Sequence, residues 1–278
     1  MNYRHAFHAG NFADVMKHVA LVAALGRLTE KDRPLFLLET HAGRGQYDLA
    51  ATGGEATSGI ARVLAAGPDD THPALARYLA IVRGMNQGER LGTYPGSPMI
   101  VAAFMRAGDR AAFCELLTGE ADALRRLFRG DPRVGVHCRD GFEALAALLP
   151  PPEKRGLALI DPPYEEQERD FEHVAEALVA AAARWPQGAL MAWYPIKLGA
   201  VAARLHRRIV DAGVKRVLVA ELCVHPDDSR AGLNGSGLVT INPPWQFAQD
   251  LQRILPALLP VLAPDGGGRT RVALLAGE

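Results

Sequence analysis

Leu37-Leu38-Glu39-Thr40-His41-Ala42-Gly43-Arg44-Gly45 combines an apolar run typical of a buried strand with an acid and a turn that contains two glycines. Glycine lets the backbone turn tightly and approach a ligand closely, and an acid at a strand end accepts hydrogen bonds from a cationic or hydroxylated ligand. The dinucleotide fingerprint GxGxxG is incomplete, because no third glycine follows Gly45 at the expected place. Taken alone, the segment fits either a ligand-binding turn or a plain glycine-rich turn, and it disfavours a dinucleotide.

Short apolar runs alternate with helical patterns along most of the chain. The runs that predict buried strands are 35–39, 111–116, 134–138, 157–160, 189–194 and 217–224, and the helical patterns include 122–128, 142–149, 171–185 and 198–212. This alternation predicts an α/β fold in which helices flank a mostly parallel sheet. Ligands of such sheets bind outside the carboxyl ends of the strands, so the residues that follow each strand are the candidates for a site.

The length of 278 residues fits roughly two domains or one enlarged α/β domain with an insertion, and we expect a single domain over residues 1–278. Residues 46–95 interrupt the alternation with helical patterns and no convincing strand, which predicts a helical insertion between the first and second strands. Two strand patterns within 217–241, separated by a polar loop, predict an antiparallel pair at the sheet edge. We therefore distinguish an N-terminal motif (1–20), the insertion (46–95) and the remainder of the core (96–278).

Composition excludes several classes of protein. With 49% hydrophobic and 22% charged residues, the chain is too apolar to be disordered, and its 31 basic residues equal its 31 acidic ones, so a nucleic-acid contact requires a local basic patch. The charged N-terminus and the lack of about 18 consecutive apolar residues favour a cytoplasmic protein. Cys114, Cys138 and Cys223 are far apart and odd in number, which predicts reduced thiols in the core.

Acids also follow the next two predicted strands, where Glu115 ends one and Asp140-Gly141 follows the other. In nucleoside-binding α/β folds, an acid after the second strand binds the ribose hydroxyls, usually about 20 residues beyond the glycine turn. The spacing here is 115 − 45 = 70 residues, and the excess of roughly 50 over that norm matches the predicted insertion. Each acid alone is as typical of a solvated strand end, but together they predict that Glu115 binds a ribose and Asp140 the adenine edge of one ligand.

The most specific motif is Asp161-Pro162-Pro163-Tyr164, after the fourth strand. Two prolines fix the backbone and remove two donors, which leaves carbonyl oxygens and a carboxylate as acceptors beside an aromatic ring. This combination suits an exocyclic amine, because acceptors on its hydrogens make the nitrogen a better nucleophile. Asn242-Pro243-Pro244-Trp245 has a similar composition, but it follows the late antiparallel pair, where a proline-rich turn before a helix is the simpler interpretation.

The N-terminal stretch 3–18 (YRHAFHAGNFADVMKH) resembles the opening motif of the RlmJ family, bacterial 23S ribosomal RNA adenine-N6 methyltransferases. The family's further motifs are also present, at 40–45, 94–98, 140–141, 161–164 and 241–245. The resemblance spans essentially the whole chain. Two positions depart from close relatives, namely Glu39, where Asp is frequent, and Leu117-Thr118, where His-Pro is frequent.

This resemblance implies a Rossmann-like class I fold with a seven-stranded sheet, S-adenosylmethionine as cofactor and an adenine of 23S rRNA as substrate, modified before full subunit assembly. Asp161 is the implied catalytic residue, Tyr3 lies near the target base, and Lys17 is a neighbour of the methionine carboxylate. The implied cofactor contacts are His18, His41, Gly43, Ser97, Glu115, Asp140, Gly141 and Asp161. We expect a monomer without a metal or a membrane partner.

The motifs favour direct methyl transfer to an extruded adenine, with Tyr164 stacking on the base. Asp161 and the Pro162 carbonyl accept hydrogen bonds from the amino group. An aspartate with an ordinary pKa of about 3.9 is too weak a base to deprotonate a neutral adenine amine, so Asp161 positions the amine and accepts its proton late.

Three alternatives remain. A DNA adenine methyltransferase explains the chemistry but not the opening motif, and a non-catalytic nucleic-acid-binding protein explains neither the glycine turn nor the acids. A metal-dependent hydrolase would use His5, His8, Asp14, His18 and His41, but this spacing lacks the i, i+4 histidine pair of helical zinc sites. The candidate cations for RNA contact are Arg125, Arg126, Arg129, Arg204, Arg207, Arg208, Lys215, Arg216 and Arg230.

Overall fold

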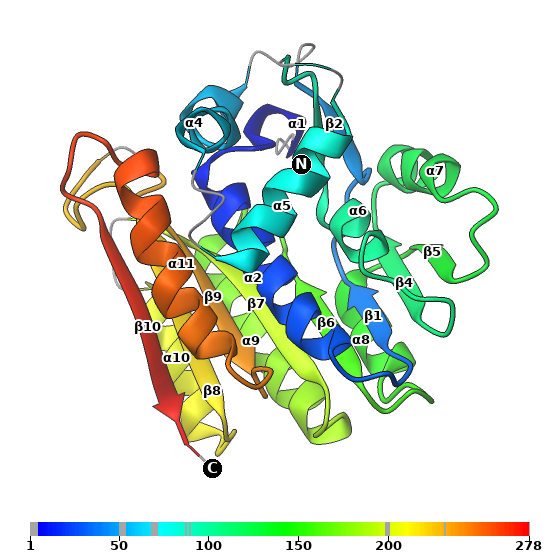
Figure 1. The fold of residues 1–278 in the computed structure, drawn as a ribbon. Helices are drawn as coiled ribbons and strands as arrows, with labels where there is room; N and C mark the ends of the chain where they lie inside the picture. Colours follow the sequence, from blue (N-terminus) through cyan, green and yellow to red (C-terminus); the bar gives the residue numbers. More distant parts are fainter. Residues whose placement is uncertain are drawn as a thin grey trace.

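The computed structural model describes residues 5–49, 54–67, 72–86, 88, 90–197, 201–230 and 232–277 as an α/β fold around one large sheet (Figure 1). The sheet contains eight strands in the order β10-β8-β9-β7-β6-β1-β4-β5. Their bounds are β1 (Phe36–Glu39), β4 (Arg110–Glu115), β5 (Val134–Cys138), β6 (Gly156–Ile160), β7 (Ala189–Ile196), β8 (Val217–Cys223), β9 (Gly235–Ile241) and β10 (Arg269–Ala276).

Strand direction follows the expected pattern. The neighbours β5, β4, β1, β6 and β7 are parallel, and β9 lies antiparallel between β7 and β8. This confirms the mostly parallel sheet with a C-terminal antiparallel pair. The sheet has eight strands and not the expected seven, because β10 pairs antiparallel with β8 and forms the edge of the sheet.

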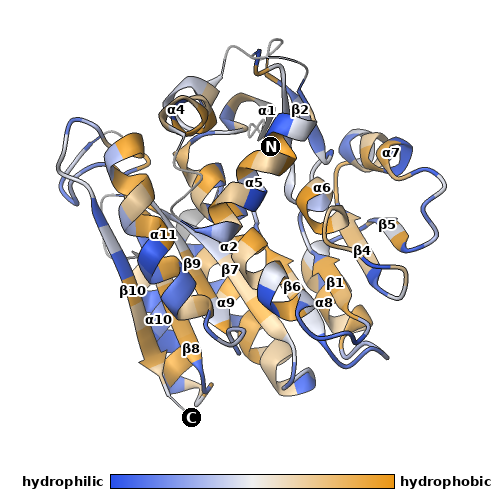
Figure 2. Ribbon diagram, viewed as in Figure 1, coloured by the Kyte–Doolittle hydropathy of each residue, from blue (hydrophilic) through white to orange (hydrophobic). Residues whose placement is uncertain are grey.

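Helices cover both faces of the sheet. Alternate residues of each central strand point to opposite sides, so Leu37 belongs to one hydrophobic core and Leu38 to the other, and Figure 2 shows these strands as predominantly hydrophobic. One core includes α2 (Phe12–Thr29), α5 (Pro73–Gly84), α6 (Ser97–Ala102) and α11 (Phe247–Leu262); the other includes α8 (Gly141–Leu148), α9 (Gln167–Arg184) and α10 (Val201–Asp211). The helix α7 (Thr118–Leu127) contacts β4 and β5.

The helix α2 is buried all around, since every residue from 13 to 25 is buried. It packs against α5, α6, α11 and β9. Polar side chains on such a helix need partners within the protein, because burial without them is costly. Asp14, Lys17 and His18 are such residues, and the site is built around them.

The insertion begins and ends in a short sheet that the sequence did not predict. Strands β2 (Gln46–Asp48) and β3 (Thr93–Pro95) pair antiparallel, and between them lie the 3-10 helix η1 (Glu55–Ser58), α4 (Ile60–Ala66) and α5. Strands of three residues are too short to show an alternating pattern. The pairing brings the two ends of the insertion together, beside the N-terminal α1 (His5–His8), which contacts η1.

Two of the three cysteines are buried as expected, but Cys138 is exposed. The expectation was wrong there because β5 is an edge strand whose last residue faces solvent. Among the residues that the structure describes, none of the helices has the length and apolarity needed to cross a bilayer.

Candidate active site

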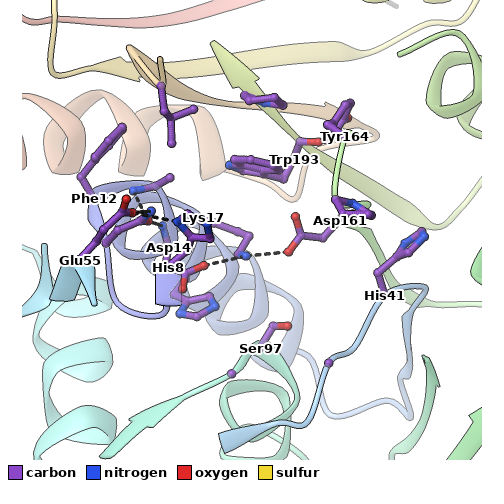
Figure 3. Close-up of a pocket in the computed structure, with 18 of the residues that line it drawn as sticks. His8, Phe12, Asp14, Lys17, His41, Glu55, Ser97, Asp161, Tyr164 and Trp193 are labelled. Atoms are coloured by element: carbon purple, nitrogen blue, oxygen red, sulfur yellow. Dashed lines mark hydrogen bonds and ion pairs between the residues drawn. The ribbon is translucent and has the colours of Figure 1, made fainter. Parts of the chain in front are cut away.

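A cavity of about 1850 Å³ opens at the carboxyl ends of β1, β4, β5 and β6 (Figure 3). The candidate site residues in the described part of the chain all line it, although they come from distant segments. They are Lys17 and His18 of α2, His41 and Gly43 after β1, Ser97 of α6, Glu115, Asp140 and Gly141, and Asp161, Pro162 and Tyr164 after β6. Tyr3 lies outside the described residues.

Lys17 connects α2 to the strand end that carries Asp161. Its Nζ lies 2.6 Å from Oδ2 of Asp161 and 2.9 Å from Oδ1 of Asp14. Burial lowers the pKa of Lys17, but the charges and hydrogen bonds of the two carboxylates outweigh this effect and raise the pKa well above its usual value. Lys17 is therefore a fixed cation that holds the Asp161 side chain in place.

Asp14 connects the ion pair of Lys17 and Asp161 to the first turn of α2. Asn11 begins the helix, because its Oδ1 accepts hydrogen bonds from the backbone N–H groups of Ala13 and Asp14, each at 2.9 Å. The other carboxylate oxygen of Asp14 accepts the N–H of Gly10 at 3.0 Å, where φ is +79°. The sequence pattern was interpreted only as placing Asp14 in a metal site, although its i, i+3 spacing to Lys17 is that of a helical ion pair. The contact of Lys17 with Asp161, 144 residues away, leaves no such local signal.

Glu39 at the end of β1 is 2% exposed and lies beside Ser97. The Ser97 hydroxyl donates to its Oε2 at 2.6 Å, whereas its Oε1 is buried without a hydrogen-bond partner among the described residues. Burial raises the pKa of Glu39 to about 8, and the hydrogen bond from Ser97 opposes this rise only in part. Ser97 lines the cavity and Glu39 does not, so Glu39 supports the site from behind Ser97.

The two histidines of the candidate site have different surroundings. Nδ1 of His18 lies 2.8 Å from the Tyr94 hydroxyl, which lies 2.8 Å from the Tyr78 hydroxyl. Burial lowers the pKa of His41 to about 4, although Asp161 and Asp140 oppose the shift. His41 is therefore neutral near pH 7, and its Nδ1 is 2.7 Å from the Thr40 hydroxyl oxygen.

The acids after β4 and β5 are held by backbone donors. Glu115 accepts the N–H of Gly43 at 2.9 Å and that of Leu117 at 2.8 Å. Asp140 begins α8, where its Oδ1 accepts from the N–H groups of Phe142 and Glu143. Each carboxylate retains lone pairs for a ligand. A Cβ at Gly141 would lie 2.1 Å from the Thr40 carbonyl oxygen, so only glycine allows β1 and α8 to approach this closely.

The Asp-Pro-Pro-Tyr turn places Asp161 at the cavity wall and turns Tyr164 inward. Tyr164 has a φ of +51° and is only 3% exposed, and its hydroxyl donates to the Trp193 carbonyl at 2.7 Å. Its ring packs against those of Phe171 and Trp193. The ring is thus fixed, and it presents little free surface to the cavity.

Trp193 of β7 is an aromatic lining residue that the sequence did not identify. It is partly exposed, its Nε1 donates to the Ser236 hydroxyl at 2.8 Å, and the Lys17 ammonium lies 5.8 Å from its ring centre. Figure 3 shows it between Lys17 and Tyr164. Its position within an apolar strand pattern gave no sign of this role.

The second Pro-Pro motif lies elsewhere. Nδ2 of Asn242 donates to the carbonyls of Pro186 and Gly188, and α11 begins at Phe247, so the segment is a turn before a helix, as predicted. None of its residues lines the cavity. Within the described ranges, no group of three or more His, Cys, Asp or Glu side chains is arranged to hold a metal ion.

Comparison with known proteins identifies the family. The family model described as "Ribosomal RNA large subunit methyltransferase D, RlmJ" matches residues 32–275. The chain belongs to this family. It is 38% identical over 283 residues to ribosomal RNA large subunit methyltransferase J of Haemophilus influenzae, and 39% identical over 282 residues to that of Escherichia coli K12, with 100% of both chains covered in each case.

A crystal structure of a protein from Legionella pneumophila supports the same assignment. It shares 36% sequence identity with this chain, has a TM-score of 0.89 and covers 96% of this chain and 98% of its own. Membership of the RlmJ family confirms the resemblance drawn from the motifs. The cavity that collects those motifs is therefore the candidate site of methyl transfer in a family of large-subunit rRNA methyltransferases.

Proposed function

We propose that this protein transfers a methyl group from S-adenosylmethionine to the N6 amino group of one adenine in 23S rRNA. The observation that carries this proposal is the Asp161 carboxylate, fixed by Lys17 in a cavity that also contains Glu115 and Asp140. A carboxylate in an Asp-Pro-Pro-Tyr turn suits an exocyclic amine, whereas a ribose hydroxyl or a ring carbon would not need two converging acceptors. Membership of the RlmJ family supports ribosomal RNA as the substrate class.

The residues of the cavity fit S-adenosylmethionine, which supplies its methyl group as an electrophile on a sulfonium. Glu115 suits the ribose hydroxyls, since both its oxygens are oriented by backbone N–H groups. Asp140 suits the adenine edge, while Gly43 keeps the turn after β1 open to a ligand. The third donor of Lys17 remains for the methionine carboxylate.

Asp161 is the catalytic residue of this proposal. Its carboxylate and the Pro162 carbonyl accept hydrogen bonds from the target amine, which localises the nitrogen lone pair toward the methyl group. The amine becomes acidic only as the new bond forms, so Asp161 accepts the proton late. Lys17 keeps the carboxylate oriented throughout.

The target base is placed by aromatic side chains. We assign the stacking surface to Trp193 and Tyr164 together: Trp193 offers the partly exposed face, and Tyr164 supports it through the hydrogen bond to the Trp193 carbonyl. Tyr3 is assigned to the same base by resemblance to the family. Such a pocket requires the adenine to be extruded or already unpaired.

The RNA has to be accessible for this reaction. We therefore extend the proposal to action on 23S rRNA before the large subunit is fully assembled. We also propose that the protein acts as a monomer in the cytoplasm.

Comparing two substrates tests the proposal. Purified protein with methyl-labelled S-adenosylmethionine is offered unmethylated, protein-free 23S rRNA or adenine-containing duplex DNA at equal nucleotide concentration. Incorporation into rRNA with little into DNA supports the proposal. Preferential incorporation into DNA would replace it with the DNA adenine methyltransferase alternative.

A further inference from the structure

The active-site cavity is acidic, although a polyanion is its proposed substrate. Among the described residues that line it, eight are Asp or Glu and four are Lys or Arg. The acids are Asp14, Glu55, Glu115, Glu120, Asp140, Asp161, Glu165 and Asp265, and the cations are Lys17, Arg44, Arg62 and Lys197. Such a lining repels phosphates and admits a neutral base, so the RNA backbone has to remain at the rim.

Two of the four lining cations are already neutralised by acids. Lys17 lies between Asp14 and Asp161. Arg44 makes a bidentate pair with Glu120, with N···O distances of 2.6 and 2.8 Å. Such pairs offer little net positive charge to an incoming phosphate.

The other two lining cations, Arg62 and Lys197, differ from Lys17 and Arg44 in their surroundings. Arg62 is exposed on α4, and Lys197 is partly buried directly after β7. Neither has an ion pair or a side-chain hydrogen bond to any residue in the described ranges. They come from separate parts of the fold, one from the insertion and one from the carboxyl end of the central sheet, so they approach the cavity from two elements (Figure 1).

Several cations that the sequence offered for RNA contact are already paired. Arg204 and Arg208 of α10 bond to Glu168 and Glu176 of α9, at 3.0 and 2.6 Å. Arg125 bonds to Asp122 at 2.7 Å. The helices α9 and α10 belong to the core on the sheet face opposite α2, and none of these arginines lines the cavity.

We infer that Arg62 and Lys197 bind backbone phosphates that flank the target nucleotide, so that the RNA strand crosses the cavity rim from α4 to the end of β7. This inference rests on the proposed function, since it takes a single-stranded or locally unpaired RNA segment as the ligand. Both cations act as point contacts to phosphate, which set position and affinity without reading sequence. The acidic interior then accepts only the extruded base.

Salt dependence of RNA binding tests this inference directly. Binding of an unmethylated, protein-free 23S rRNA fragment is measured for the full chain between about 50 and 200 mM salt. Each lost phosphate contact lowers the magnitude of the slope of log K against log salt by about 0.7 to 1. We expect this change for Arg62→Ala and for Lys197→Ala, with affinity several-fold weaker at the lowest salt and about twice the change in slope for the double variant.

The matched controls are Arg253→Ala and Lys31→Ala, because both residues are exposed and neither lines the cavity. These controls should keep the wild-type slope. For Arg62→Ala and Lys197→Ala, we expect the KM for RNA to rise while kcat at saturating RNA and the dissociation constant of S-adenosylmethionine stay within about twofold. Circular dichroism melting checks that each variant is folded.

The outcomes separate this inference from the proposed function. Unchanged slopes in both variants, with normal methylation of rRNA by the wild type, would overturn the rim contacts and leave the function intact. Reduced slopes with no methylation of adenine by the wild type would overturn the function and leave the RNA contact. A loss of kcat without a change in slope would also overturn the inference, because it would place these cations in the chemistry instead.

Discussion

Asp161 is the proposed proton acceptor of the reaction, and its carboxylate is paired with the buried ammonium of Lys17. In Asp161→Asn the amide keeps the shape of the side chain but cannot accept the proton of the methylated amine. We expect kcat to fall by about 10²- to 10⁴-fold, the usual contribution of a positioned acid or base. The dissociation constant of S-adenosylmethionine, measured by calorimetry, should change far less.

The control for this variant is Asp211→Asn at the end of α10, which is exposed and does not line the cavity. It should keep wild-type turnover. An Asp161→Asn enzyme with undiminished kcat would remove Asp161 from the mechanism.

Glu39 makes stability depend on pH. Burial raises its pKa from 4.5 to about 8, so the folded protein keeps this proton while the unfolded chain loses it. Between these two values the folded state binds more protons, and the free energy of unfolding therefore falls as the pH rises. In Glu39→Gln this contribution is absent, so the stability of the variant relative to wild type should rise from pH 5 to pH 8, by on the order of a few kcal/mol.

Urea unfolding of both proteins at pH 5, 6, 7 and 8 measures this difference. Stability curves that run parallel over the whole range would show that Glu39 does not carry a raised pKa.

The sequence predicted which residues belong to the site better than it predicted the contacts between their side chains. Glu115, Asp140 and Asp161 could be placed in one cavity because parallel strands end at the same edge of a sheet. The pair Asp14–Lys17 has the i, i+3 spacing of a helical ion pair, which the sequence does show. The contact of Lys17 with Asp161, and the role of Trp193, could not be predicted. Both depend on which side chains α2 and β7 bring together in space, and neither leaves a periodic pattern in the sequence.

Among the elements, α4 depends on a close backbone contact with the N-terminal turn. A Cβ at Gly59 would lie 2.1 Å from the Gly10 carbonyl oxygen, the same oxygen that accepts the N–H of Ile60 at 2.8 Å. Gly59→Ala should therefore displace α4 and lower the free energy of unfolding by about 1 to 3 kcal/mol. Because α4 carries Arg62, the KM for RNA should rise as well.

Gly84→Ala is the control, since a Cβ at that position at the end of α5 would have no atom within 4 Å apart from its chain neighbours and its own helix backbone. Its stability should stay unchanged or rise slightly. If Gly59→Ala melts at the wild-type temperature, the contact between α4 and the N-terminal turn does not support the fold.

The prediction of elements succeeded where patterns were long. The core strands and α8, α9 and α10 were expected within a few residues of their observed bounds, since buried parallel strands are continuous apolar runs. The strands β2, β3 and β10 were missed for two reasons. The first two have three residues each, and β10 is an edge strand whose residues are only partly buried, so its apolar character is mixed with Arg269 and Arg271.

For the molecule as a whole, one buried ion cluster holds three helices of the same layer together. Asp250 of α11 accepts two hydrogen bonds from Arg27 of α2, each at 2.7 Å, and its Oδ1 lies 3.1 Å from Nε2 of His72, which begins α5. Asp250→Ala leaves the Arg27 guanidinium without this partner. We expect the free energy of unfolding to fall by about 2 to 4 kcal/mol, somewhat less than for a fully buried pair because Arg27 is partly exposed.

Arg253→Ala on the exposed side of the same helix is the matched control, and it should unfold like wild type. At temperatures where Asp250→Ala is folded, its kcat should be close to that of wild type, since none of these three residues lines the cavity. A variant of normal stability would show that the cluster does not hold the layer together.

The most direct test of the central claim is to locate the transferred methyl group. Unmethylated 23S rRNA is incubated with the protein and S-adenosylmethionine that carries a deuterated methyl group, then digested to nucleosides and to mapped fragments for mass spectrometry. We expect the label on the N6 atom of a single adenine with the wild-type protein, and labelling at least about 100-fold slower with Asp161→Asn. Label on a ribose oxygen or a ring carbon, or equal label with the Asp161→Asn variant, would contradict the account.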